Sequence, residues 1–165
     1  MQTGRINPVD MSRASQPMDS PIEQQIAGFL ARYDPAISAL AVDARRRLRR
    51  RLPTATELVY DNYNALVFGY GASDRASDGI LSIALYPRWV TLFFLHGVGL
   101  SDPSGLLQGS GTPVRGVRLS KASDLEAPAI AALITEAGGR AGTALPQEDG
   151  ATVIKSVSAR QRPRT

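Results

Sequence analysis

The stretch ILSIALYPRWVTLFFL, residues 80–95, decides the fold. Branched and aromatic side chains fill two runs within it, Ile80–Tyr86 and Trp89–Leu95, and such residues favour β-strands. The connection YPRW, residues 86–89, is too short for anything but a hairpin, because parallel neighbours need a long crossover. The two runs are therefore predicted to be antiparallel neighbours, which excludes a doubly wound parallel sheet.

Further short β-type runs lie on both sides of this hairpin. Two of them, Glu57–Tyr60 and Ala65–Phe68, precede it in the chain. After it, a glycine-rich loop, Gly97–Thr112, leads into a further run, Val114–Leu119. Turn-forming residues separate these runs, as expected for consecutive strands of one sheet.

Two helices are predicted before the strands. The segment SPIE, residues 20–23, has the form of a capping box with proline at the first helical position, and this helix should end near Arg32. Asp34 and Pro35 repeat the start signal, and the apolar residues that follow share one face of a helix until Pro53 stops it. These apolar residues are Ile37, Leu40, Ala41, Ala44, Leu48 and Leu52.

A third helix should follow the last strand. Ser123 or Asp124 caps it, and its apolar residues, Leu125, Ile130 and Leu133, fall on one side together with Ile134. The order of elements predicts an α+β fold: a single antiparallel β-sheet covered by two N-terminal helices and one C-terminal helix. All three helices should cover the same face, which leaves the other face partly open.

Both ends of the chain lack a sustained apolar period. We expect residues 1–19 to be a disordered tail, residues 20–137 to form the domain, and residues 138–165 to be a flexible basic tail. Between the ends, no internal repeat is present.

Composition limits the classes of protein to consider. A chain of 165 residues with 43% apolar residues has enough material for one core of ordinary size. It contains no cysteine, which excludes disulfides, thiolate nucleophiles, iron–sulfur clusters and cysteine-bound zinc. No apolar run is long enough for a signal peptide or a membrane span, so we expect a soluble, cytoplasmic protein.

Three segments carry a resemblance to a known family: LYPRWVTLFF (85–94), LSDPSGLLQGSG (100–111) and VRGVRLSKASDLEAPAIAALI (114–134). In these segments the chain resembles the YdhG-like family, a bacterial domain family of unestablished function, over about Ile22 to Ala137. The resemblance implies a helix-covered antiparallel sheet similar to frataxin. Some relatives are proposed iron chaperones, so iron becomes a cofactor or cargo to consider.

Catalytic patterns are absent from the sequence. His96 is the only histidine, and no serine stands in a nucleophile elbow. The glycines of Gly97–Gly99 and Gly109–Gly111 resemble nucleotide-binding loops but lack the residues and the following helix that such loops need. We therefore expect a domain that is not an enzyme.

Iron binding through surface oxygen ligands is one alternative function. The candidate carboxylates are Asp19, Glu23, Asp34, Asp43, Glu57 and Asp61. They are sparse, and the arginines of the second helix would repel a cation. The sequence predicts no tightly held transition metal, and any iron would bind weakly.

The arginine block RRRLRRR, residues 45–51, is a second candidate surface. Arg46, Arg47, Arg50 and Arg51 would contact an acidic partner or nucleic acid, although no aromatic residues are interleaved to stack bases, so nucleic acid is not favoured. The other interpretation is a solvated helix face whose cations are favoured by the helix dipole.

The main hypothesis is a site for a small molecule or a protein partner. Polar aromatic residues at the end of the first strand are expected to face the glycine-rich loop across a cleft, with an arginine near its wall. The expected ligand-binding residues are Tyr60, Asp61, Tyr63, Asn64, Leu107, Gly109, Ser110, Gly111 and Arg118. Alternatively, the tyrosines simply cover the sheet. We expect a monomer or a homodimer.

Overall fold

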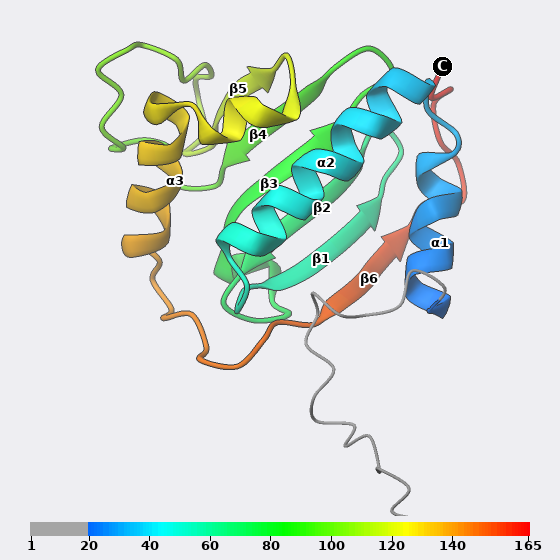
Figure 1. The fold of residues 1–165 in the computed structure, drawn as a ribbon, viewed down its shortest axis with the longest axis horizontal. Coiled ribbons are helices and arrows are strands. Elements are labelled where there is room, and N and C mark those ends of the chain that lie inside the picture. The colour runs from blue at the N-terminus through cyan, green and yellow to red at the C-terminus, as the bar shows by residue number, and fades with distance from the viewer. Residues whose placement is uncertain (1–19) are drawn as a thin grey trace, which may run out of the picture.

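The fold comes from a computed structural model that describes residues 20–165, and it is shown in Figure 1. Its described part contains one six-stranded sheet and three α-helices, two before the strands and one after the first five. The predicted α+β class is confirmed. The expected N-terminal tail, residues 1–19, lies outside the described residues.

The predicted hairpin lies inside the sheet. Strand β3 (Gly79–Leu85) pairs with β4 (Val90–Phe94) in antiparallel register, with Leu85 opposite Val90. The backbone N–H of Tyr86 donates to the carbonyl of Trp89 at 2.9 Å, and the two rings stack with centroids 5.2 Å apart. The short YPRW connection therefore forms the turn that the sequence predicted.

The remaining strands extend this pair on both sides. Strands β1 (Thr56–Asp61) and β2 (Leu66–Gly71) lie beside β3, and β5 (Arg115–Leu119) lies beside β4. All neighbours among these five strands are antiparallel, as expected. The full order across the sheet is β5-β4-β3-β2-β1-β6.

The sixth strand was not expected. Strand β6 (Thr152–Val157) comes from the segment for which the sequence predicted a flexible tail, and it pairs parallel to β1, which makes the sheet mixed. The chain reaches this edge after α3 by a long connection that passes the end of the sheet (Figure 1). The structured part of the chain therefore extends well past residue 137.

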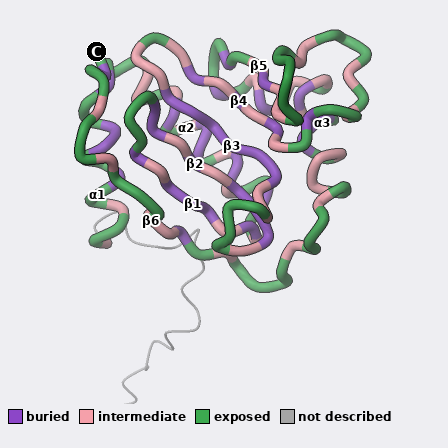
Figure 2. Tube along the Cα trace, turned by 180° about the vertical axis from the view of Figure 1, so that it is seen from behind, coloured by how far each residue is buried: buried purple, intermediate pink, exposed green. Residues whose placement is uncertain are grey.

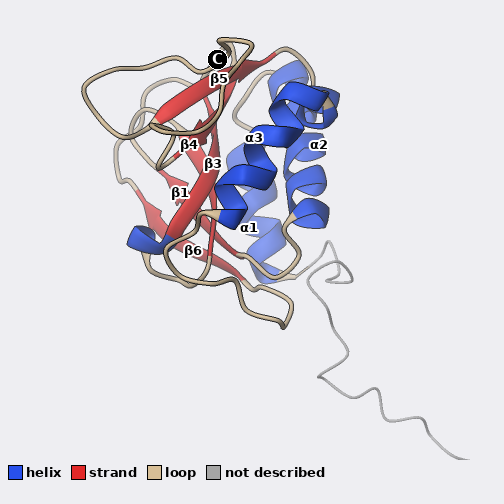
Figure 3. Ribbon diagram, turned by 90° about the vertical axis from the view of Figure 1, so that its left-hand side faces the viewer, coloured by secondary structure: helices blue, strands red, loops and turns tan. Residues whose placement is uncertain are grey.

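The helices form one layer on one face of the sheet (Figure 3). Helix α1 (Pro21–Leu30) lies by β6, α2 (Pro35–Arg51) crosses the middle of the sheet, and α3 (Pro128–Gly139) lies near β4 and β5 (Figure 1). The predicted last helix consists of two parts: a short 3₁₀ turn, Ala122–Glu126, and then α3, which begins at Pro128. No helix of the described residues is long and apolar enough to cross a bilayer.

The apolar core fills the space between the helices and the sheet. Side chains alternate along each strand, so every second residue points to the helices. Phe68, Ile83 and Leu92 are opposite one another in register and fully buried on this side, where Ala44 and Leu48 of α2 join the same core. The helices thus bury one face of the sheet, whereas none of the three α-helices covers the other (Figure 3).

Candidate functional site

The helix-facing side of the sheet contains a buried cluster of charged residues. Glu57 of β1 is fully buried and accepts hydrogen bonds from Arg45 at 3.0 and 2.9 Å, from Tyr70 at 2.6 Å and from Thr152 at 2.9 Å. Arg45 also donates to both carboxylate oxygens of Glu23. This cluster joins α1, α2, β1, β2 and β6, and its partners are all supplied by the chain itself.

These partners also fix the charge of Glu57. Burial acts to raise the pKa of this carboxyl, but the hydrogen bonds and the charge of Arg45, with the hydroxyl of Tyr70, outweigh burial and lower the pKa below its ordinary value. Glu57 is thus a buried carboxylate held ionised by an arginine. Both of its carboxylate oxygens accept hydrogen bonds from within the chain.

The C-terminal segment covers the turn in which several ligand-binding residues were predicted. Arg164 is buried, its Nη2 lies 3.0 Å from Oδ1 of Asp61, and its guanidinium lies over the ring of Tyr33. Arg162 lies over the ring of Tyr63, and its backbone N–H donates to the carbonyl of that residue. Asp61 and Tyr63 therefore contact the chain's own terminal segment.

The remaining predicted ligand residues do not assemble as expected. Strand order places β2, β3 and β4 between β1, which carries Tyr60, and β5, which carries Arg118. Four neighbour spacings of about 4.8 Å separate these strands by roughly 19 Å. The prediction that the Tyr60–Asn64 turn and the Leu106–Gly111 loop face each other across a cleft is therefore corrected: the two segments lie towards opposite edges of the sheet. The order of the strands follows from long-range pairing, which the sequence did not reveal.

The glycine-rich loop lies beside β5. Gln108 forms a backbone bridge with Gly116, and the carboxylate of Asp102 accepts the backbone N–H groups of Leu106 and Leu107. Both leucines pack partly against the core, whereas Gly109, Ser110 and Gly111 are exposed, as is Asn64 on the β1–β2 turn. The guanidinium of Arg118 lies 4.5 Å from the centre of the Trp89 ring.

Most arginines of this block bind other residues of the same chain. Arg47 pairs with Asp43 and Glu126, and Arg51 donates to Thr135 and to the carbonyl of Ala131, so both hold neighbouring elements. Arg46 forms an exposed pair with Asp43. Arg50 is exposed and borders a hollow between α2 and α3. An acidic partner at this surface stays a prediction.

Four of the six carboxylates considered for iron are similarly engaged, and Asp19 lies outside the described residues. Glu23, Asp43, Glu57 and Asp61 each pair with an arginine. Within residues 20–165, no group of three or more histidine and carboxylate residues is arranged to hold a metal ion. Nothing in this arrangement favours the iron hypothesis over the others.

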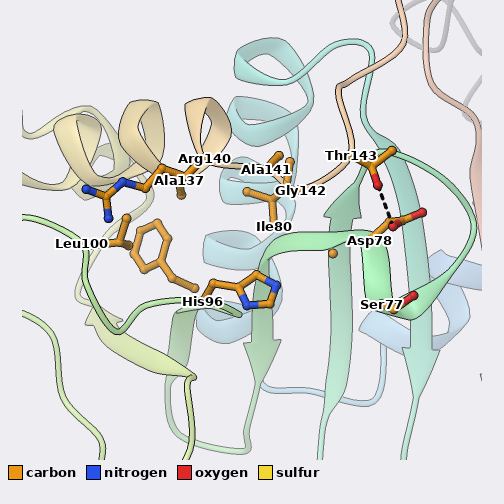
Figure 4. A pocket seen from close by; sticks show the side chains of 12 residues that line it. Ser77, Asp78, Ile80, His96, Leu100, Ala137, Arg140, Ala141, Gly142 and Thr143 are labelled. Carbon is orange, nitrogen blue, oxygen red and sulfur yellow. Dashed lines mark hydrogen bonds between the residues drawn. The ribbon is translucent and has the colours of Figure 1, made fainter.

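A small pocket holds the single histidine. Figure 4 shows it between the beginning of β3, the segment after β4 and the segment after α3, with His96 and Asp78 on its wall. Asp78 accepts hydrogen bonds from Ser73 and Thr143, which lower its pKa, and Arg140 is bound to Gly99 and Glu136. The pocket holds about 90 Å³, which is small for a ligand site.

A larger groove lies on the face of the sheet opposite the helices, which is the face seen in Figure 2. Its volume is about 380 Å³, within the range of small-molecule sites. The apolar side chains around it are Leu58, Val67, Phe93, Leu95 and Val114. Tyr60 borders the same groove, and burial raises the pKa of its hydroxyl. One predicted ligand residue thus faces a groove that the sequence did not predict.

The floor of this groove is made of small residues. In one row across the sheet, Leu58 is opposite Gly69, Gly69 opposite Ser82, and Ser82 opposite Phe93. The two small residues therefore lie between two large apolar ones. A methyl group added at Gly69 would meet nothing closer than the carbonyl oxygen of Leu58, at 3.7 Å. The space above Gly69 is thus open rather than filled by the protein.

No protein family, curated protein or solved structure matches this chain. The sequence signal for this site is Gly69 in LVFGYG, residues 66–71, because a glycine within a strand often marks the close approach of a ligand or another backbone.

Proposed function

We propose that this protein is a non-catalytic binding domain that holds a small, largely apolar molecule in the groove on the open face of its sheet. The observation that carries this proposal is the open space above Gly69, enclosed by Leu58 on one side and Phe93 on the other. The groove has the size and the mainly apolar lining of small-molecule sites, with a few polar groups at its border.

The glycine itself supports the proposal. Glycine within a strand costs about 0.5–1 kcal/mol relative to alanine, because it loses more backbone freedom on folding. At Gly69 the packing of the protein does not require glycine, since the methyl group of an alanine has room there. A ligand lying on this strand would explain the glycine, because the ligand would occupy the space that a side chain at position 69 would otherwise fill.

The lining also supports binding rather than catalysis. No aspartate, glutamate or histidine is among the described residues that line the groove. Its polar side chains include Tyr60, Asn62 and Ser82, which suit orientation of a ligand more than proton transfer at neutral pH. Iron delivery, which the YdhG-like resemblance implies, stays a separate and untested alternative.

Titration with octanol, followed by backbone amide NMR, tests the proposal. Octanol is an uncharged apolar probe, so it reports the groove without help from ion pairing. We expect shifts concentrated at Gly69, Ser82 and Phe93 and small changes in α2. Shifts confined to the α2–α3 hollow, or absent altogether, would contradict the proposal.

A further inference from the structure

We infer that the natural ligand is an amphiphilic anion whose negatively charged end is bound by Arg75 and whose apolar body lies along β2 over Gly69. This inference rests on the proposed function, because it assigns the chemistry of the molecule in the same groove.

Arg75 carries the only charge that lines the groove within the described residues. It lies in the loop between β2 and β3, where its side chain is exposed. In the described part of the chain its guanidinium has no hydrogen bond and no ion pair. A guanidinium at the mouth of an apolar groove matches a carboxylate or another anionic group.

Asp78, a carboxylate of the same loop, forms no ion pair with Arg75. Asp78 is close enough for the charge of Arg75 to lower its pKa, although the hydrogen bonds from Ser73 and Thr143 contribute more. Its two oxygens already accept these bonds, one from Ser73 at 2.6 Å and the other from Thr143 at 3.1 Å. The guanidinium of Arg75 can therefore bind an external anion.

The shape of the groove places the apolar body of the ligand. Arg75 follows the end of β2 at Gly71, whereas Tyr60 and Asn62 lie at the opposite end of the paired strands. Between these ends the floor contains Gly69 and Ser82, and the borders are apolar. A molecule with its anionic group at Arg75 would lie lengthwise along β2, with its tail directed towards Tyr60.

The hydroxyl of Ser82 adds a polar contact along this path. Ser82 is largely buried on the groove floor, and its hydroxyl has no hydrogen bond to the described residues. Its single hydroxyl can accept or donate but carries no charge. The body of the ligand is thus expected to be mainly apolar, and the charge selectivity is assigned to Arg75 alone.

A series of probes with one alkyl chain and different head groups tests the inference. Octanoate, octanol and octyltrimethylammonium are titrated against the full chain, against Arg75→Gln, and against Arg88→Gln as a control. Arg88 is an exposed arginine of the β3–β4 turn outside the groove, so its substitution makes the same change in net charge.

We expect octanoate to bind about tenfold more tightly than octanol, since a charge-assisted hydrogen bond is worth more than a neutral one. The cationic probe should bind most weakly. Arg75→Gln should reduce octanoate to the affinity of octanol and leave octanol within about twofold, whereas Arg88→Gln should change neither.

The outcomes separate this inference from the proposed function. If octanoate and octanol bind the groove equally, or if Arg75→Gln keeps the preference for octanoate, the inference is wrong and the proposed function stands. If none of the three probes shifts the groove amides, both are wrong.

Discussion

The Nη2 atom of Arg164 lies 3.0 Å from Oδ1 of Asp61, and the two side chains are only 1% and 2% exposed. An arginine next to the end of the chain is thus buried against the end of β1. Its Nη2 also donates to the carbonyl of Asn62, and the N–H of Ser158 donates to the carbonyl of Asp61. The C-terminal segment is part of the folded domain.

Replacing Arg164 with alanine should therefore destabilise the protein. Because the substitution leaves the Asp61 carboxylate buried without its main partner, we expect a loss of about 3–5 kcal/mol in the free energy of unfolding. Urea denaturation measures this loss. Arg160→Ala, at an exposed position nearby, is the matched control and should change the free energy by about 0.5 kcal/mol or less. Equal stability of the two variants would contradict the role given to Arg164.

The Arg45–Glu57 pair predicts a coupled response to mutation. Arg45→Met alone should cost about 3–5 kcal/mol, because it leaves the buried Glu57 carboxylate without its arginine. Glu57→Gln alone should cost less, because Arg45 keeps its hydrogen bonds to Glu23. The double variant should be less destabilised than the sum by about 1–3 kcal/mol. Urea denaturation of all four proteins measures this coupling. Additive losses would show that the two side chains do not act as a pair.

The lowered pKa of Glu57 predicts loss of stability in acid. The stabilisation from this carboxylate is fully present above its ordinary pKa of 4.5 and is lost as the pH falls through the lower pKa of the folded state. The free energy of unfolding should therefore decrease below about pH 4.5, and less steeply in Glu57→Gln. The same dependence on pH in both proteins would refute this assignment.

The central fold was predictable because its signals are local. The YPRW connection fixes an antiparallel pair whatever the rest of the chain does, and the proline-initiated apolar arc identifies α2. Strand β6 was not predictable in this way. It is short, it lies among glycine, proline and charged residues, and it gains its order by pairing with β1. Such long-range pairing leaves no local pattern.

The charged cluster shows a similar limit. Arg45 belongs to a block of arginines that is typical of a solvated helix face, yet it is buried beside Glu57. Its spacing from Ala41 and Leu48 places it near the apolar arc of α2, and this was the available signal. For the groove, Tyr60 was identified from its chemistry, whereas Gly69 was missed because the prediction placed the ligand beside the glycines of a loop.

Filling the groove tests the central claim most directly. Gly69→Leu places a side chain in the open space above β2. Gly28→Leu in α1 is the control, since a methyl group added at Gly28 meets nothing within 4 Å. The two variants are compared with the unmodified protein by NMR titration with octanoate and by thermal unfolding. We expect Gly69→Leu to keep or raise the Tm and to weaken octanoate binding about tenfold or more, with Gly28→Leu binding as the unmodified protein does. A folded Gly69→Leu variant that binds octanoate with unchanged affinity would contradict the assignment of the groove as the binding site.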